Sequence, residues 1–114
     1  MNKTIYIAGK VSGEPLEDCV MKFDKAQKEI EDLGFKAVNP VKMVQEYLFA
    51  DAELRHSSEE VIWIFAMKKC LEALEFCDAI YMLPCYTDSK GAMIEHRTAT
   101  KLGIQIYYEL ETII

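Results

Sequence analysis

DAIYMLPCYTDSKGAMIEHRTATKLGIQIYY, residues 78–108, contains a strand, a helix and a second strand in succession. Residues 78–83 are predicted to form a strand with apolar residues on both faces, as the buried strands of parallel sheets have. A helix is predicted over residues 89–103, where Gly103 ends it, and residues 104–108 have the composition of a strand. This order predicts two parallel strands joined by a right-handed crossover.

The residues before this unit continue the same alternation. Strands are predicted at residues 4–8 and 35–38, and helices at residues 15–33 and from Ser57 or Ser58 to residue 76. Residues 41–56 have an ambiguous, partly helical pattern that can form a flap over a site, and residues 109–114 form a tail or a turn of helix. We expect a single α/β domain over residues 1–114, a three-layer, flavodoxin- or Rossmann-like sandwich around a four-stranded parallel sheet of order 2-1-3-4.

The composition restricts the classes of partner. The formal net charge of −6 argues against a surface for nucleic-acid polymers or anionic membranes, because both need clustered Lys and Arg. No apolar stretch approaches the roughly 20 residues that span a bilayer, and Met1 leads into a strand without a signal-peptide pattern. The expectation is a soluble, cytoplasmic protein whose partners are small ligands or proteins.

The cysteines show no sign of a metal site or a redox motif. Cys19, Cys70, Cys77 and Cys85 include no CxxC pair, and without an export signal they are expected to stay reduced as packing residues. Cys70 and Cys77 lie about two helical turns, roughly 10 Å, apart, which is too far to share one zinc ion. The sequence predicts no metal and no cofactor.

Glu95 is a carboxylate on the small, apolar face of the predicted helix at residues 89–103. Five other residues lie within roughly 60° of it around the helix axis: Gly91, Ala92, Thr98, Ala99 and Leu102. A buried carboxylate is usually paired or kept for chemistry. Because helical side chains lean toward the N-terminus, Glu95 points over Gly91 toward the start of its helix, where open α/β folds bind ligands.

Two loops are candidates for holding an anion beside Glu95. In a sheet of order 2-1-3-4, the loops after strands 1 and 3 diverge and leave a crevice between them. The first loop, Gly9 to Gly13, can expose backbone N–H groups and the Ser12 hydroxyl. The second ends in Asp88 and Ser89 at a helix N-terminus, which favours phosphate. Glycine loops and serine caps also arise for purely local reasons.

Residues 61–67, from Val61 to Met67, are apolar all round (VIWIFAM). A surface helix rarely has this pattern, and a chain of this size has little interior with which to surround a helix. The segment is therefore either core on two sides or an oligomer contact. We favour a homo-oligomer, a dimer or larger, formed through this helix.

Four motifs resemble one known family over nearly the whole chain. They are KTIYIAG at residues 3–9, Asn39-Pro40, Cys77-Asp78, and Ser89-x-Gly91-Ala92-x-x-Glu95 with Gly103. Together they resemble the nucleoside 2-deoxyribosyltransferase-like superfamily. This superfamily includes 2'-deoxynucleoside 5'-phosphate N-hydrolases and a small branch of unknown function common in phage and bacterial genomes.

The resemblance implies roles for three residues. Glu95 matches the nucleophile that attacks C1' of a 2-deoxyribosyl group and displaces the base, and Tyr6 matches a tyrosine that hydrogen-bonds it. A carboxylate suits this chemistry, because a glycosyl-enzyme ester divides one difficult displacement into two easier ones. Asp78 matches an acidic position at the start of strand 3, although that end of the sheet lies away from the crevice.

The same resemblance favours a phosphorylated ligand. Ser89 stands where the nucleotide hydrolases carry the serine that holds the 5'-phosphate and where the transferases carry Asp. Against this, Glu14-Pro15 stands where the hydrolases have an arginine, and Lys10 is the candidate replacement for its charge. The predicted substrate contacts are Gly9, Lys10, Ser12, Gly13, Asn39, Asp88, Ser89 and Gly91.

The remaining charged residues of this helix are not predicted to bind a ligand. His96 points about 100° away from Glu95 and is interpreted as a surface or packing residue. Lys90, Arg97 and Lys101 are predicted to lie on a solvated face opposite Glu95.

The leading hypothesis is a hydrolase or transferase of the N-glycosidic bond in a 2'-deoxynucleoside 5'-monophosphate or a related small nucleotide. The alternative is a non-catalytic nucleotide-binding module, such as a phage- or defence-related sensor. A third possibility is an oligomeric scaffold built on residues 61–67.

Overall fold

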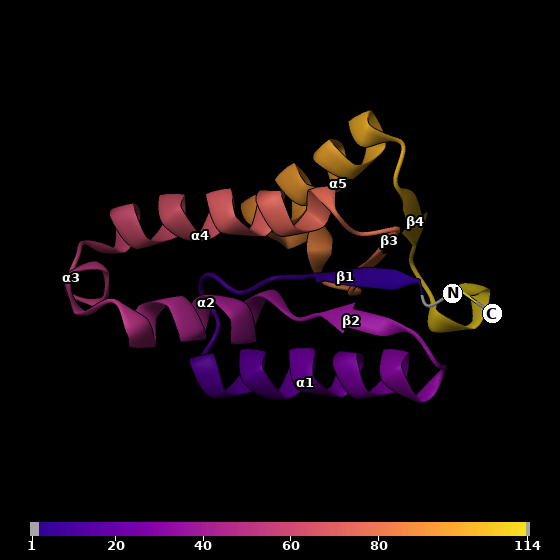
Figure 1. Cartoon of the computed structure of the whole chain (residues 1–114), viewed down its shortest axis with the longest axis horizontal. Helices are drawn as coiled ribbons and strands as arrows, with labels where there is room; N and C mark the ends of the chain where they lie inside the picture. The colour runs from indigo at the N-terminus through magenta and orange to yellow at the C-terminus, as the bar shows by residue number, and fades with distance from the viewer. Residues whose placement is uncertain (1–2, 114) are drawn as a thin grey trace.

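The computed structural model describes residues 3–113 and contains one parallel sheet (Figure 1). Its strands, β1 (Thr4–Ala8), β2 (Lys36–Val38), β3 (Ala79–Met82) and β4 (Gln105–Tyr107), lie in the order β2-β1-β3-β4. Every neighbouring pair is parallel. The predicted fold class and strand order are therefore confirmed, and each strand matches its predicted position to within one or two residues.

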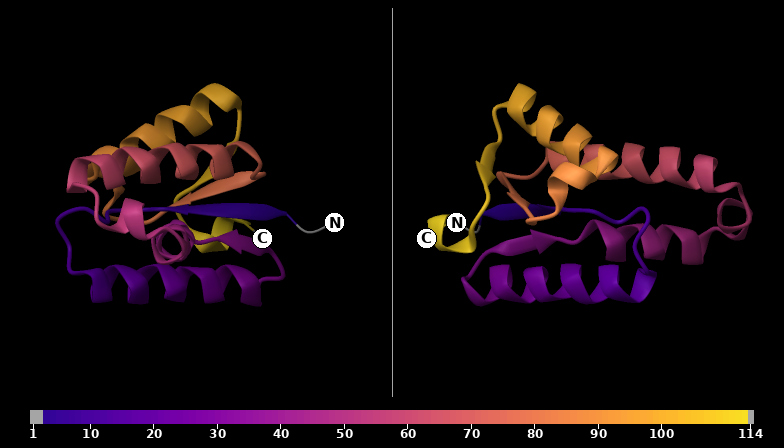
Figure 2. Two further views of the ribbon diagram at one scale, coloured as in Figure 1. Left: turned by 60° about the vertical axis from the view of Figure 1, so that its left-hand side comes forward. Right: turned by 180° about the vertical axis from the view of Figure 1, so that it is seen from behind.

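Helices cover both faces of this sheet and make the three layers seen in Figure 2. One face carries α1 (Leu16–Asp32), and the other carries α4 (Glu59–Glu75) and α5 (Lys90–Leu102). Alternation along β1 divides the core, because successive strand residues face opposite sides. Ile5 and Ile7 pack with Phe23 of α1, whereas Tyr6 packs with the cluster beneath α4 and α5.

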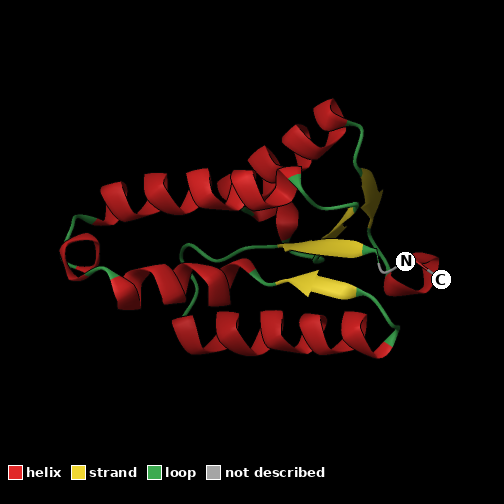
Figure 3. Ribbon diagram, viewed as in Figure 1, coloured by secondary structure: helices red, strands yellow, loops and turns green. Residues whose placement is uncertain are grey.

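The ambiguous segment is helical. It forms α2 (Pro40–Ala50) and α3 (Ala52–Arg55), which lead into α4. Asn39 caps α2 by accepting a hydrogen bond from the Lys42 N–H at 3.2 Å, and Pro40 begins the helix, where no N–H partner is needed. Figures 1 and 3 show α2, α3 and the start of α4 projecting beyond the carboxyl ends of the strands. This hairpin accounts for the elongated shape of 42 × 28 × 27 Å.

The helix boundaries follow local capping. Ser58 accepts from the Val61 N–H and begins α4, but the reciprocal glutamate of a capping box is missing because Val61 holds that position. Short 3₁₀ turns occupy Tyr86–Asp88 and Leu110–Ile113, the latter within the predicted tail. Within residues 3–113, no helix combines the length and apolar composition needed to cross a bilayer.

Candidate active site

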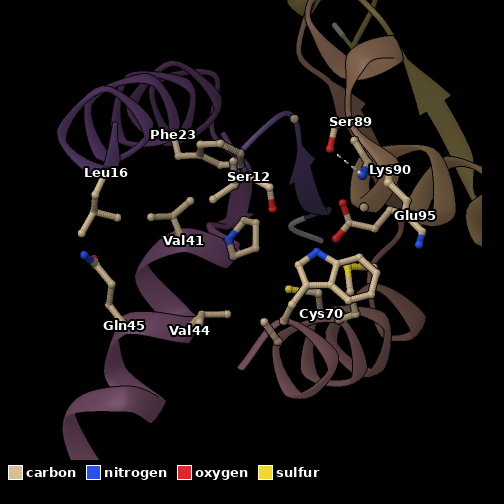
Figure 4. Close-up of a pocket in the computed structure, with 18 of the residues that line it drawn as sticks. Ser12, Leu16, Phe23, Val41, Val44, Gln45, Cys70, Ser89, Lys90 and Glu95 are labelled. Atoms are coloured by element: carbon tan, nitrogen blue, oxygen red, sulfur yellow. Dashed lines mark hydrogen bonds between the residues drawn. The ribbon is translucent and has the colours of Figure 1, made fainter. Parts of the chain in front are cut away.

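A cavity of about 540 Å³ lies at the carboxyl ends of the strands. Its walls come from the loop after β1, from α2, from α4 and from the start of α5 (Figure 4). Gly9 lies where the two loops begin to diverge, and a Cβ added there would lie only 2.7 Å from the Leu83 side chain. Glycine at this position therefore lets the ends of β1 and β3 approach closely. The cavity is the crevice expected from the strand order.

Glu95 reaches this cavity from α5, although only 5% of its surface is exposed. Its Oε2 accepts a hydrogen bond from the hydroxyl of Tyr6, a fully buried residue of β1. Burial raises the pKa of the Glu95 carboxyl to about 7, and the hydrogen bond from Tyr6 opposes that rise. Burial and the neighbouring Glu95 also raise the pKa of Tyr6 well above its usual value. Tyr6 is therefore a neutral donor that orients the carboxylate.

The small face of α5 makes room for this arrangement. Ala92 and Ala99 are buried against the sheet on either side of Glu95. A Cβ on Gly91 would lie 3.2 Å from the sulfur of Met67, so the glycine allows α4 to pack close to the start of α5. The predicted apolar face is thus the buried one at Ala92, Glu95 and Ala99, but not at Leu102, which is 50% exposed. Met67 occupies part of the space that Gly91 leaves.

Ser89 caps α5 and can also donate a hydrogen bond to a ligand. Its Oγ accepts a hydrogen bond from the Ala92 N–H at 3.1 Å and caps α5. The cap uses a lone pair of the hydroxyl, so its proton remains available for an oxygen of a ligand. Ser89 also lines the cavity, together with Asp88. The start of α5 can therefore hold an anion with a hydroxyl and a helix N-terminus.

Lys22 of α1 joins the two loops that border the cavity. Its ammonium donates to the Lys10 carbonyl at 2.8 Å and to Glu14 Oε1 at 2.7 Å, and it lies 3.4 Å from Cys85 Sγ. Lys10 and Glu14 belong to the first loop, and Cys85 belongs to the loop after β3. The hydrogen bond from Lys22 lowers the pKa of Glu14. Glu14 therefore neutralises the charge of Lys22, which holds the two loops together.

Comparison with known proteins identifies the family. A family model described as a domain of unknown function (DUF4406) matches residues 3–108. The chain belongs to the DUF4406 family. The search of curated proteins found no match.

The fold of this DUF4406 domain is shared with an enzyme of known structure. A 2-deoxyribosyltransferase from the psychrotolerant bacterium Bacillus psychrosaccharolyticus superposes with a TM-score of 0.64 at 24% sequence identity. The match covers 90% of this chain and 69% of that enzyme, which is described as a biocatalyst for the synthesis of antiviral and antitumoral nucleosides. The fold expected from the predicted resemblance is confirmed.

Not every predicted site residue of the DUF4406 domain lines the cavity. Gly9, Ser12, Asp88, Ser89, Gly91 and Glu95 do, whereas Lys10, Gly13, Asn39 and Asp78 are absent from its lining. Tyr6 is also absent from the lining, because it is fully buried behind Glu95, to which it donates its hydrogen bond. The Asn39 amide donates to Asp24 Oδ1 at 3.0 Å and to Gln27 Oε1 at 3.1 Å, in addition to capping α2. Asp78 accepts from the Thr4 N–H at 2.8 Å, at the opposite end of the sheet. These contacts explain both residues through the packing of neighbouring elements.

The wall from α4 was not predicted, whereas the wall from α2 lies where residues 41–56 were expected to form a flap. The α2 face presents Val41, Val44, Gln45 and Leu48, and Gln45 supplies an uncharged amide (Figure 4). From α4 come Trp63, Met67 and Cys70. Burial and the neighbouring Glu95 raise the pKa of Cys70 to about 12, so its thiol is neutral. For α4 the available signal was the apolar pattern of residues 61–67, which was interpreted as an oligomer contact.

Lys90 is exposed, as predicted, but the prediction that it lies opposite Glu95 and away from the site is wrong. Lys90 lines the cavity, and its ammonium lies 5.4 Å from the centroid of the Trp63 ring. The physical reason is that the first residue of a helix leans back past the N-terminus rather than across the helix face. His96 is turned away from the cavity as expected, with its Nε2 2.8 Å from the Tyr108 hydroxyl.

Lys22→Met is expected to loosen the first loop of the DUF4406 domain without unfolding it. The change removes a partly exposed ammonium that has several hydrogen-bond partners. We expect the free energy of local opening of this loop to fall by about 1 kcal/mol, which makes amide exchange over residues 10–14 roughly fivefold faster. Hydrogen exchange with mass spectrometry measures this rate. Lys28→Met is the matched control, because its ion pair with Asp32 on the same helix is exposed. Equal exchange in both variants would contradict the role given to Lys22.

Proposed function

We propose that this domain cleaves or transfers the N-glycosidic bond of a 2'-deoxynucleoside 5'-monophosphate or a related small nucleotide. The observation that carries the proposal is the buried Glu95 carboxylate, oriented by Tyr6 and open to a cavity at the carboxyl ends of the strands. A carboxyl group kept in such surroundings is typical of a catalytic nucleophile. The shared fold with a 2-deoxyribosyltransferase supports the same reaction class.

The proposed reaction uses the two oxygens of Glu95 differently. Tyr6 donates to Oε2, which leaves Oε1 to attack C1' of the deoxyribosyl group. The bond from C1' to the base nitrogen breaks, the base leaves with the electron pair and takes up a proton, and a C1'–O ester forms. Water then releases deoxyribose 5-phosphate and regenerates the carboxylate. A second base in place of water gives transfer instead of hydrolysis.

The walls of the cavity suit the parts of such a ligand. The apolar side chains of α2 and α4 can contact the base and exclude water from the ester intermediate. Ser12, Ser89 and the N-terminus of α5 lie on the loop side, where hydroxyl and backbone donors can bind the 5'-phosphate. In this proposal Glu95 lies between the base and the 5'-phosphate of the ligand.

The test is to incubate the pure protein with each 2'-deoxynucleoside 5'-monophosphate and with the matching deoxynucleosides and ribonucleotides. Free base is followed by chromatography, and ligand binding is followed by thermal shift. Base release from deoxynucleotides supports the proposal. Stabilisation by a nucleotide that remains intact would instead support the non-catalytic binding module.

The exposed face of α4 supports self-association. Val61 is 49% exposed and Ile64 is 56% exposed, and no residue of α4 before Cys70 is buried. The neighbouring Trp63 and Met67 face the cavity, so the outer face of the same helix remains uncovered in a single chain. We infer a homo-oligomer through residues 61–67.

Ile64→Glu is expected to dissociate this oligomer, because a charge placed inside an apolar interface raises the dissociation constant by about tenfold or more. Analytical ultracentrifugation at several concentrations measures the mass. Leu102→Glu is the control, since Leu102 is an equally exposed apolar residue of α5, 50% accessible. An unchanged mass distribution for Ile64→Glu, or an equal change in both variants, would exclude this interface.

A further inference from the structure

We propose that Lys90 selects phosphorylated ligands, by moving its ammonium from the Trp63 ring to the phosphate when a nucleotide binds. The inference rests on the proposed nucleotide site and assigns its charge selectivity to one residue. It starts from two observations: Lys90 lines the cavity, and its ammonium lies 5.4 Å from the centroid of the Trp63 ring.

The charges around the cavity require a cation for phosphate binding. Glu95 and Asp88 line it with carboxylates, and the whole chain has a formal net charge of −6. A 5'-phosphate adds a charge of about −1.5 to −2 at neutral pH. Hydroxyl and backbone donors can orient this group, but they do not cancel the repulsion from the carboxylates. A ligand without phosphate meets no such repulsion, so the cation matters only for the nucleotide.

Lys90 is the cation in the right position. Among the described residues 3–113, it is the one Lys or Arg that lines the cavity. It follows Ser89 directly, at the first position of α5, where the helix N-terminus also favours an anion. The two other lysines nearby are excluded by their contacts: Lys10 does not line the cavity, and the Lys22 ammonium is held by Glu14 and the Lys10 carbonyl.

The contact between the Lys90 ammonium and the Trp63 ring is weak enough to be replaced by a contact with phosphate. A lysine ammonium on a flexible four-carbon chain interacts with an indole face weakly when the site is exposed, and Lys90 is exposed. A charge-assisted hydrogen bond to phosphate is stronger than this contact. Trp63 therefore holds the ammonium at the edge of the cavity and releases it to the ligand. Because Trp63 is the single tryptophan of the chain, its fluorescence reports the movement.

The test compares 2'-deoxyadenosine 5'-monophosphate with 2'-deoxyadenosine. Calorimetry gives both dissociation constants for the parent Glu95→Gln, which prevents turnover and keeps the Asp88 carboxylate. The same constants are measured for Lys90→Met, Lys90→Arg and the control Lys101→Met, each combined with Glu95→Gln. Lys90→Met is expected to weaken nucleotide binding at least tenfold and to change nucleoside binding less than twofold. Lys90→Arg and Lys101→Met are expected to keep the nucleotide preference. Equal weakening of both ligands, an unchanged preference in Lys90→Met, or binding of neither ligand would overturn the proposal.

A second readout uses 2-deoxyribose 5-phosphate, which has no base and does not absorb where Trp63 is excited. Titration of the wild type is expected to change the Trp63 emission, and Lys90→Met is expected to remove that change. An emission change that persists in Lys90→Met would exclude the movement. Failure of the glycosidase proposal is seen separately, as absence of base release in the wild type, and it leaves the selectivity result unaffected.

Discussion

Glu95→Gln is expected to lower base release from a 2'-deoxynucleoside 5'-monophosphate by about a thousandfold or more. The amide oxygen can still accept the hydrogen bond from Tyr6, so the orientation of the side chain is retained. It cannot form the glycosyl ester, because an amide is a far weaker nucleophile than a carboxylate. Single-turnover assays with chromatography of the free base measure the loss.

Tyr6→Phe is the matched comparison, because it removes only the hydroxyl that orients Glu95. We expect a smaller loss, about tenfold to a hundredfold, since the nucleophile itself remains. Mass analysis of rapidly quenched wild-type protein should also find a deoxyribosyl phosphate adduct on the peptide that contains Glu95. Base release by Glu95→Gln at the wild-type rate would remove Glu95 from the mechanism, whatever Tyr6→Phe shows.

The same Glu95→Gln change is expected to increase the free energy of unfolding near pH 8 by about 3 kcal/mol. Burial raises the pKa of Glu95 from its ordinary 4.5 to about 7, so the folded protein holds this proton more tightly than the unfolded chain. The contribution of Glu95 to stability is therefore full below about pH 4.5 and is lost as the pH rises through about 7. Glutamine carries no charge at any of these pH values and avoids the loss.

Urea unfolding of both proteins between about pH 5 and pH 8 measures this difference directly. The gap between Glu95→Gln and the wild type should widen with pH, because all other titrating groups are common to both proteins. Glu46→Gln is the control, as an exposed glutamate of α2. A constant gap between Glu95→Gln and the wild type across this range would show that the Glu95 pKa is not raised. An acid that reduces stability at neutral pH is consistent with a functional role.

Local patterns were enough to predict most of the fold. The apolar run at residues 79–83, the glycine stop at Gly103 and the serine cap at Ser58 each depend on a few consecutive residues. Their combination predicts four parallel strands in the observed order, because right-handed crossovers leave few alternatives. The position of Glu95 on a small helix face was predictable for the same reason, since helical periodicity depends on spacing alone.

The residues around Glu95 could not be predicted from sequence spacing, because they come together through contacts between distant elements. The wall from α2 and α4 depends on how a helical hairpin folds back over the sheet, and residues 41–56 have no clear periodicity of their own. Trp63 and Lys90 come together because α4 packs against α5 at Gly91. Both residues therefore line the cavity, although Trp63 was predicted to lie in an oligomer interface and Lys90 on a solvated face away from the site.

The sequence by itself determined the secondary structure, the strand order and the face of α5 that carries Glu95, because capping, periodicity and crossover handedness act within or between adjacent elements. Only the tertiary structure decided which side chains surround that carboxylate. Lys22 reaches Cys85 across 63 residues of the chain, and Tyr6 reaches Glu95 across 89. Such contacts form only when packing brings distant elements together. The same packing buries the Glu95 carboxyl, and this burial raises its pKa.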